Sequence, residues 1–288
     1  MTSVEALSRA RNSLHAARIE AAPQEARLVL CHLLGVSSTQ LYGEPERKLT
    51  EAQELRLGEI LRRRASREPL AYILNTCEFY GHEFYVDPRV LIPRPETELL
   101  VDLVRQSVKR RKRDKEDGVV SLADVGTGSG AIAVSLALAL KELEIYATDI
   151  SPSALDVARI NLAQHSLADK VALLQGDLLE AIPEPVDVMV ANLPYVSSRD
   201  MATLDPEIAA FEPWVALYGG ADGLEHVAAL LDRAATKLEP RAELLFEIGQ
   251  GQAHAAKKAA ARYLPRAAID IVPDPAGIDR VVHAVLTH

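Results

Sequence analysis

Cysteine, aromatic residues and long apolar runs are all scarce in this sequence of 288 residues. No apolar run approaches the roughly 20 residues that a helix needs to span a bilayer, and the N-terminus lacks the basic and apolar segments of a secretory signal. The two cysteines, Cys31 and Cys77, lie far apart and outside any CxxC or Cys/His ligand pattern, so neither a disulfide framework nor a metal site is predicted. These absences predict a cytoplasmic protein without bound metal or membrane association.

Basic residues are outnumbered, because 32 Lys and Arg stand against 41 Asp and Glu and give a net charge of −9. Proteins that bind nucleic acid directly usually carry a basic face, so direct nucleic-acid binding is not expected. One basic run, Lys109-Arg110-Arg111-Lys112-Arg113, follows a helical pattern, and we interpret it as a solvated helix end rather than a binding patch. The length predicts a small domain and a larger one.

Helical signals dominate residues 1–75. Thr2 with Glu5, and Thr50 with Gln53, have the capping-box spacing of helix starts. We therefore expect a small domain of four or five helices.

Strand patterns begin after this helical part. Residues 76–95 are expected to form a β-hairpin and a linking segment, and a helix is expected to begin at Glu96 or Thr97. Residues 96–288 then alternate between strand and helix patterns, which predicts an α/β domain with a doubly wound, mostly parallel sheet and a final hairpin. The expected strands cover residues 119–125, 144–148, 171–175, 186–191, 243–248, 268–272 and 280–286, and the expected helices cover residues 131–140, 152–165, 224–238 and 252–263.

A glycine-rich loop joins the first of these strands to its helix, and it reads Asp124-Val125-Gly126-Thr127-Gly128-Ser129-Gly130. Its glycines would let a ligand approach backbone N–H groups near the helix N-terminus. Asp149 ends the next strand, where its carboxylate could accept hydrogen bonds from both hydroxyls of a ribose. The glycine spacing differs from the dinucleotide fingerprint, and Asp124 would sit badly against a pyrophosphate but could face an ammonium group. S-adenosyl-L-methionine has an ammonium group and no phosphate, so the loop favours a methyltransferase over a dehydrogenase.

Two further strand ends add to this predicted cofactor site. Asp177 and Leu178 follow the third strand, where they could contact an adenine amino group and ring, although an Asp-containing turn is an equal local alternative. The fourth strand leads into Asn192-Leu193-Pro194-Tyr195. A carboxamide held beside a stiff backbone suits the binding of a planar NH2 group, and Asn192 is also expected to contact the cofactor. Taken alone, this tetrapeptide is equally compatible with a strand-ending turn, and the NH2 group could belong to a base or to an amide.

The sequence resembles the HemK/PrmC family of release-factor glutamine methyltransferases along nearly its whole length. The motifs that carry the resemblance are Glu78-Phe79-Tyr80-Gly81, Ile92-Pro93-Arg94-Pro95-Glu96-Thr97-Glu98, the glycine-rich loop, Asn192-Leu193-Pro194-Tyr195 and Phe211-Glu212-Pro213.

This resemblance implies the sheet of a class I S-adenosylmethionine-dependent methyltransferase. It implies methylation of the side-chain amide nitrogen, N5, of the glutamine in the Gly-Gly-Gln motif of class 1 peptide chain release factors, which supports translation termination. The product of the cofactor would be S-adenosyl-L-homocysteine. The helical domain is expected to help hold the protein substrate, and the enzyme is expected to be a monomer.

The expected catalytic and substrate-binding residues are those of the tetrapeptide, together with Arg94 for the substrate. We expect the Asn192 side-chain oxygen and the Leu193 backbone oxygen to accept the two amide hydrogens, while Tyr195 packs against the glutamine side chain. The family's usual tetrapeptide is Asn-Pro-Pro-Tyr. Leu193 keeps the carbonyl of the position it occupies, and Pro194 still favours an extended backbone there.

Several alternatives remain at this stage. Asn-Leu-Pro-Tyr also resembles the motif of ribosomal RNA adenine dimethyltransferases, so an adenine-N6 methyltransferase acting on RNA or DNA is the main alternative. A glutamine methyltransferase acting on a ribosomal protein and a non-catalytic cofactor-sensing module are the others. Arg94 could pair with a carboxylate near the site or could stabilise a turn, whereas Glu212 and Glu247 could be members of structural ion pairs. No histidine lies in a motif, so none is assigned chemistry.

Overall fold

The computed structural model describes residues 1–114 and 118–287 and divides into two compact units. The first unit comprises Met1–Thr76 and Asp205–Phe211, and the second comprises Cys77–Leu204 and the chain from Glu212 onward. From Cys77 onward, the segment expected as a β-hairpin and linker (residues 76–95) belongs to the second unit, and its role as a linker stays a prediction. Residues 115–117 and 288, which fall in the predicted larger domain, lie outside the described residues.

The first unit is helical, as the sequence predicts. It contains the helices α1 (Ser3–Ala16), α2 (Ala22–Leu34), α3 (Ser38–Gly43), α4 (Glu51–Ala65), α5 (Leu70–Leu74) and α9 (Pro206–Phe211). Both predicted capping boxes form, with Thr2 capping α1 and Thr50 capping α4. Apolar side chains from the first five helices make one continuous core.

Helix α9 is joined to this unit by a buried arginine on α4. Arg64 Nη1 lies 2.9 Å from Glu207 Oε1 on α9, and Arg64 Nε donates to Glu25 Oε2 at 2.6 Å. The Arg64 side chain is only 5% exposed, so both carboxylates balance a charge that water cannot reach. Arg67 adds an ion pair to Glu207 at 3.3 Å. A segment far along the sequence is thereby part of the helical unit.

The second unit begins with a hairpin of β1 (Cys77–Phe79) and β2 (His82–Phe84). Its two-residue turn, Tyr80-Gly81, has positive φ at both positions, which is the backbone that a type I′ turn requires. The 3-10 helix η1 (Pro95–Thr97) then leads into α6 (Glu98–Asp114). The predicted hairpin and the predicted helix start near Thr97 are both confirmed.

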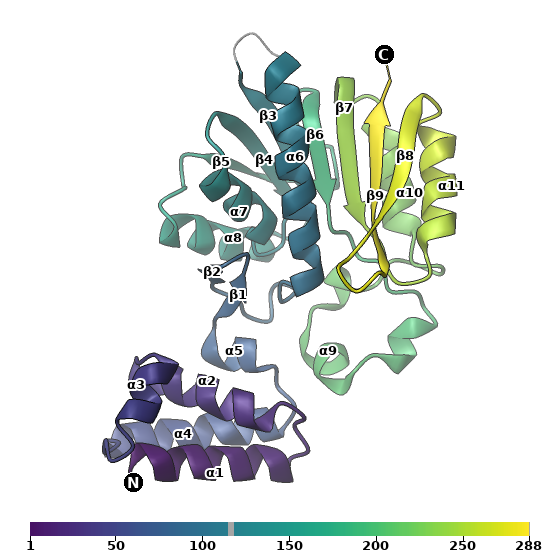
Figure 1. The fold of residues 1–288 in the computed structure, drawn as a ribbon. Helices are drawn as coiled ribbons and strands as arrows, with labels where there is room; N and C mark the ends of the chain where they lie inside the picture. The colour runs from purple at the N-terminus through teal and green to yellow at the C-terminus, as the bar shows by residue number, and fades with distance from the viewer. Residues whose placement is uncertain (115–117, 288) are drawn as a thin grey trace. The chain divides into compact units, whose positions relative to one another are not determined.

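A seven-stranded sheet forms the centre of the second unit, in the order β5-β4-β3-β6-β7-β9-β8 (Figure 1). Strands β3 to β7 are parallel, and β9 runs antiparallel to both β7 and β8. The doubly wound, mostly parallel sheet with a final hairpin is therefore confirmed. The strands are β3 (Val120–Val125), β4 (Leu143–Asp149), β5 (Val171–Gln175), β6 (Val186–Ala191), β7 (Leu238–Glu247), β8 (Ala267–Pro273) and β9 (Asp279–Leu286). The remaining helices are α7 (Ala131–Ala139), α8 (Pro152–Gln164), α10 (Glu225–Ala234) and α11 (Ala253–Tyr263), with 3-10 turns η2 (Asp200–Thr203) and η3 (Trp214–Ala216).

Both faces of the central strands are buried. On β3, Leu122 belongs to the core shared with α6, α7 and α8, whereas its neighbour Ala123 belongs to the core shared with α10 and α11. Val188 and Met189 divide in the same way on β6. This explains why these strands appear in the sequence as mostly apolar runs without a regular alternation of apolar and polar residues. Within the described ranges, no helix is long and apolar enough to cross a membrane.

Both predicted boundaries at the junction of α10 and β7 are wrong, because the strand was also expected to begin only at residue 243. The helix expected over residues 224–238 ends at Ala234, and Leu238 already pairs with Val186 as the first residue of β7. The register shifts between Val186 and Val188, because β7 contains extra residues before the ladder resumes at Glu243. Pro240 lies in this irregular stretch, where its missing N–H costs no ladder hydrogen bond.

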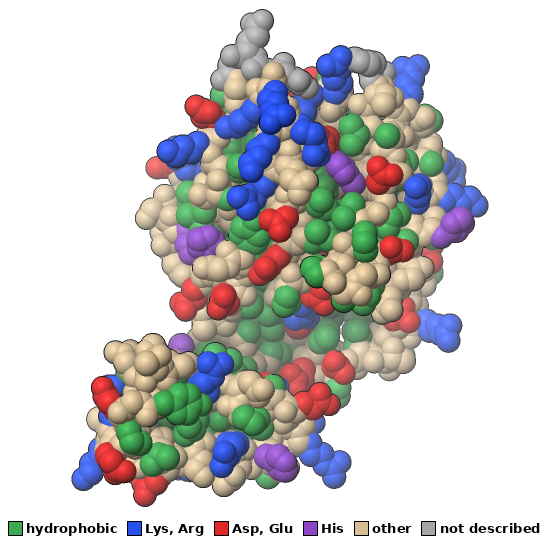
Figure 2. Space-filling view, in the orientation of Figure 1, with side chains coloured by type: hydrophobic (Ala, Val, Ile, Leu, Met, Phe, Trp, Pro, Cys, Tyr) green, Lys and Arg blue, Asp and Glu red, His purple; other side chains and the backbone are tan. Residues whose placement is uncertain are grey.

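The basic run at the end of α6 is only partly solvated, which corrects the interpretation from sequence. Figure 2 shows Lys and Arg side chains gathered over this helix. Arg111, however, is buried and donates to Asp187 Oδ1 at 2.6 Å, and Arg110 donates to Glu243 Oε2 at 2.7 Å. These two arginines attach α6 to the sheet, and only part of the run faces solvent.

We expect Glu243→Gln to lower the free energy of unfolding by about 2 kcal/mol near neutral pH. Glu243 is buried, and it contacts Ser107 Oγ at 2.6 Å, Arg110 Nη2 at 2.7 Å and His283 Nε2 at 2.7 Å. Burial alone would raise the pKa of Glu243, but the hydrogen bonds from His283, Arg110 and Ser107 outweigh it and lower the pKa to about 2.

The expected effect depends on pH, because the folded-state pKa lies below the unfolded value of 4.5. The charged carboxylate stabilises the fold above the unfolded pKa, and its contribution disappears as the pH falls toward the folded pKa. Urea unfolding of both proteins at about pH 7 and about pH 3 measures this. The difference between wild type and variant should shrink at the lower pH, and an unchanged difference would contradict the prediction.

Candidate functional site

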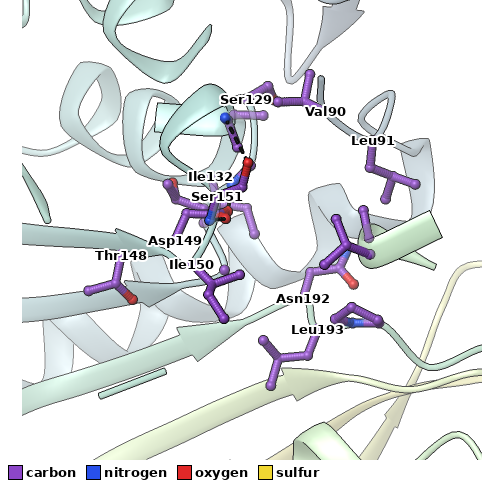
Figure 3. Close-up of a pocket in the computed structure, with 18 of the residues that line it drawn as sticks. Val90, Leu91, Ser129, Ile132, Thr148, Asp149, Ile150, Ser151, Asn192 and Leu193 are labelled. Carbon is purple, nitrogen blue, oxygen red and sulfur yellow. Dashed lines mark hydrogen bonds between the residues drawn. The ribbon is translucent and has the colours of Figure 1, made fainter. Parts of the chain in front are cut away.

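A pocket lies at the carboxyl ends of β3, β4, β5 and β6. The strand order reverses between β3 and β6, and ligands of open α/β sheets bind at such a switch point. Figure 3 shows Asp149 and Asn192, from two separate strand ends, in the wall of this pocket. The predicted site residues that line it are Arg94, Gly126, Thr127, Gly128, Ser129, Asp149, Asp177, Leu178, Asn192, Leu193 and Pro194.

The wall at β4 suits a ribose. Asp149 Oδ2 accepts from the Gly128 N–H and Asp149 Oδ1 accepts from the Ser151 N–H, both at 2.9 Å. Each oxygen keeps a lone pair for a further donor. Burial raises the pKa of Asp149, against the effect of these backbone donors. Gly128 has no atom within 4 Å of the position that a Cβ would occupy, so its backbone is open to a close ligand. The Asp149 carboxylate fits the hydroxyls of a ribose, and the open glycine loop leaves room for a ligand close to its backbone.

Asp124 and Gly130 lie behind this wall. The Asp124 side chain is fully buried, and its Oδ2 accepts from Thr127 Oγ1 at 2.6 Å. Burial raises the pKa of Asp124 to about 6, although the Thr127 hydrogen bond opposes the rise. Only Oδ2 serves the loop, whereas Oδ1 has no hydrogen-bond partner among the described residues. Direct contact of Asp124 with an ammonium group therefore stays a prediction. Gly130 packs against α8, where a Cβ would lie 3.3 Å from Ala158 Cβ.

Asp177 and Leu178 form the wall at the end of β5. Asp177 Oδ2 accepts from Arg233 Nη1 at 3.0 Å, a partner on α10 that the sequence did not reveal. Leu178 has a φ of 51°, in the left-handed region that costs a residue with a Cβ some strain. The Thr148 hydroxyl donates to the Leu178 carbonyl at 3.0 Å and holds this conformation. Backbone strain held in place at a pocket wall is typical of functional sites.

The Asn192 carboxamide follows β6, and within the described ranges its NH2 group is hydrogen-bonded whereas its oxygen is not. Its Nδ2 donates to Thr97 Oγ1 at 3.0 Å. Among the residues that the structure describes, no group donates to Asn192 Oδ1. The Leu193 side chain is buried, and its Cδ2 lies 3.0 Å from where a Cβ on Gly126 would be. In Figure 3 the Leu193 side chain turns away from the carboxamide. Where the family usually has proline, this protein therefore has a leucine whose side chain packs against the glycine-rich loop.

Tyr195 does not line the pocket. Its hydroxyl donates to Glu247 Oε1 at 3.2 Å, and its carbonyl accepts from Gln252 Nε2 at 2.9 Å. Gly223 lies against the same carbonyl with a φ of 79°, and a Cβ there would meet the Tyr195 oxygen at 2.3 Å. The position therefore requires glycine. Direct packing of Tyr195 on a substrate stays a prediction, whereas its attachment to Glu247 is observed.

Arg94 forms an ion pair with Glu212, the first of the two roles considered from sequence. The Glu212 side chain is 1% exposed, and its Oε2 also accepts from the Ile92 N–H at 3.3 Å. Arg94 itself lines the pocket and is partly exposed. The buried carboxylate holds the extended segment between its prolines against the site.

Sequence reasoning missed several pocket residues. His226 lines the pocket although no motif contains it. Thr97 lies in a motif, but we interpreted it only as a helix start. The apolar residues Ile150 and Val215 also line the pocket and are largely exposed. The only available signal was for Thr97, whose motif could have suggested a side-chain role.

Comparisons with known proteins cover nearly the whole chain. The family model of the PrmC N-terminal domain matches residues 5–74, and that of the methyltransferase small domain matches residues 97–208. A release factor glutamine methyltransferase of Nitratidesulfovibrio vulgaris is 36% identical over 284 residues, which are 96% of this chain and 93% of the relative. One of Bacillus cereus is 36% identical over 260 residues, covering 89% and 90%. A crystal structure of a methyltransferase from Pyrococcus furiosus, 16% identical, superposes with a TM-score of 0.53 over 83% of this chain and 100% of that one, which is a likeness of fold alone.

Proposed function

The chain belongs to the family of release factor glutamine methyltransferases, and we propose that it methylates the side-chain amide nitrogen, N5, of the glutamine in the Gly-Gly-Gln motif of class 1 peptide chain release factors. The methyl donor in this proposal is S-adenosyl-L-methionine. The sheet of the second unit is that of class I S-adenosylmethionine-dependent methyltransferases. The observation that carries the proposal is the Asn192 carboxamide, which lines the same pocket as Asp149 and whose oxygen accepts no hydrogen bond from the described residues.

The pocket residues would hold S-adenosyl-L-methionine by its nucleoside. Asp149 would accept hydrogen bonds from the ribose hydroxyls through the lone pairs that its two backbone donors leave free. The loop at Gly126 and Gly128 would approach the tail of the cofactor closely, and Leu178 would pack on the adenine. When bound, the cofactor supplies a methyl group on a positively charged sulfur. The protein's own contribution to the reaction is to orient the acceptor amide.

The acceptor amide is a poor nucleophile, because its nitrogen lone pair is delocalised into the carbonyl. In our proposal Asn192 Oδ1 and the Leu193 carbonyl accept the two amide hydrogens, which fixes the nitrogen in line with the methyl group. The same two oxygens stabilise positive charge as it develops on that nitrogen. Methyl transfer leaves the positive charge on the N-methylated amide, and this cation is acidic enough to lose one N–H proton to solvent without a dedicated base.

The helical unit supplies a second surface for a protein substrate. We propose that residues 1–75 help hold the release factor, that residues 76–95 connect to the catalytic part, and that residues 96–288 carry out methyl transfer. The match of residues 5–74 to the PrmC N-terminal domain supports this division.

Incubation with labelled S-adenosylmethionine and either a class 1 release factor or ribosomal RNA tests the proposal. We expect label on the Gly-Gly-Gln glutamine and none on RNA. A release factor whose motif glutamine is replaced by alanine should remain unlabelled, which controls for methylation elsewhere. Label only on adenine would support the alternative of an adenine-N6 methyltransferase, and the absence of label on either would contradict the proposed activity.

A further inference from the structure

A chain of hydrogen bonds runs behind the Asn192 carboxamide and ends at a buried carboxylate. Asn192 Nδ2 donates to Thr97 Oγ1 at 3.0 Å, and Thr97 Oγ1 donates to Glu247 Oε2 at 2.7 Å. The Thr97 residue is 4% exposed and Glu247 is 1% exposed, so water does not compete for these bonds. The three residues come from the end of β6, from η1 and from the end of β7, and are separated by 95 and 150 residues in the sequence.

The number of protons that each group can donate fixes the donor and the acceptor of each of these hydrogen bonds. An ionised carboxylate can only accept hydrogen bonds, so Thr97 must use its single hydroxyl proton on Glu247. The Thr97 oxygen can then only accept from its other neighbour, and only the NH2 end of Asn192 can donate to it. The carboxamide oxygen is therefore left on the opposite side, where no described residue donates to it.

The same carboxylate also fixes the tyrosine of the tetrapeptide. Tyr195 donates to Glu247 Oε1 while Thr97 donates to Oε2, so each carboxylate oxygen receives one hydroxyl. Burial raises the pKa of Glu247, and the two hydroxyl donors and the charge of Arg280 oppose the rise. Glu247 thus connects both polar side chains of the tetrapeptide to the end of β7.

We propose that Thr97 and Glu247 are positioning residues that fix which end of the Asn192 carboxamide faces the acceptor amide. An asparagine side chain free to rotate by half a turn would present its NH2 group to the substrate NH2 for part of the time. Two donors then face each other and no hydrogen bond forms. This inference rests on the proposed function, because the orientation matters only for an acceptor that donates hydrogen bonds.

Replacement of Thr97 tests the proposal by separating shape from hydrogen bonding. Thr97→Val keeps the shape and removes the hydroxyl, whereas Thr97→Ser keeps the hydroxyl. We expect kcat for methylation of the release factor to fall about ten-fold in Thr97→Val, the loss of one oriented hydrogen bond. The KM for S-adenosylmethionine should stay unchanged, and Thr97→Ser should restore kcat. Wild-type kcat in a folded Thr97→Val protein would overturn the proposal.

Replacement of Glu247 tests which groups donate and which accept in these hydrogen bonds. In Glu247→Gln the new NH2 group could donate to Thr97, which would free the Thr97 proton to point at Asn192 and favour the reversed carboxamide. We expect a loss of kcat at least as large as that of Thr97→Val. Glu243→Gln is the matched control, because it removes another buried carboxylate from the same strand, away from the pocket. Equal kcat losses in the two glutamine variants would point to a merely structural role and overturn the proposal.

Two measurements distinguish failure of this inference from failure of the proposed function. In an Asn192→Ala background, Thr97→Val should cause no further loss of kcat, and a further ten-fold loss would contradict positioning through Asn192. The Asn192 side-chain NH2 resonance, assigned by its disappearance in Asn192→Ala, should exchange with solvent faster in Thr97→Val than in wild type. This second readout needs no acceptor, so it reports on the hydrogen bond even if the release factor is not methylated. Unchanged exchange would overturn the proposal.

Discussion

Asn192→Ala is expected to lower kcat for methylation of the release factor by about 10²- to 10³-fold, as loss of one preorganised hydrogen-bonding group typically does. The carboxamide oxygen is the open acceptor in the pocket, and its NH2 end is already held by Thr97. Alanine removes the acceptor without introducing a clash. Single-turnover transfer of a labelled methyl group to the Gly-Gly-Gln glutamine measures the effect directly.

Controls must show that this loss is chemical. The thermal unfolding midpoint should change little, because the Asn192 side chain makes a single hydrogen bond among the described residues and is only partly buried. Asn192→Asp is the informative companion, since it keeps the shape and one oxygen but loses the donor to Thr97. Near-native turnover by a folded Asn192→Ala protein would show that the carboxamide does not bind the acceptor, and the proposed mechanism would then be wrong.

Asp149→Asn is expected to raise the Kd for S-adenosylmethionine about 100-fold, the equivalent of about 2.7 kcal/mol. Both carboxylate oxygens accept backbone N–H groups and have further lone pairs on the pocket side. In the asparagine variant one of these atoms becomes a donor. It would then face either the N–H of Gly128 or that of Ser151, and the pocket would lose a charged acceptor for a ribose hydroxyl. Titration calorimetry with the cofactor measures the change without any protein substrate.

Asp156→Asn is the matched control for this experiment. It removes the same charge from the first half of α8, where Asp156 is exposed and pairs with Arg159 at 2.6 Å. Surface ion pairs of this kind contribute little, so its Kd should equal that of the wild type. Cofactor binding that is equally strong in both variants would contradict the assignment of Asp149 to the ribose.

Two strands of the sheet could be predicted from sequence to the residue. The ranges expected for β5 and β6 match those observed, because each is a mostly apolar run that is followed by a glycine or a polar residue. β6 is buried along its whole length, whereas most residues of β5 are partly or fully exposed. The start of β7 could not be predicted in this way. Leu238 follows a helical pattern directly, and only its pairing with Val186 across the sheet shows that it belongs to a strand.

The candidate site was predictable where strand ends bring backbone motifs together. The glycine loop, Asp149 and Asn192 each follow an apolar run, so the topology alone assembles them at one edge of the sheet. The partners of these residues were not predictable, because a side-chain hydrogen bond leaves no local pattern. Arg233 and Glu247 belong to segments far from the groups they contact. For Asp124, the sequence predicted the position next to the glycine-rich loop but not that the side chain is fully buried.

The ion pairs that join α9 to the helical unit have a consequence for exchanging parts between relatives. Because Glu207 pairs with Arg64 and Arg67, the helical unit is not encoded by one contiguous stretch of the gene. A chimera that received only residues 1–76 from a relative would combine foreign helices with the resident Glu207. To keep the ion pairs of Glu207 with Arg64 and Arg67, a chimera must receive residues 205–211 together with residues 1–76. These two segments are therefore expected to be inherited as a pair.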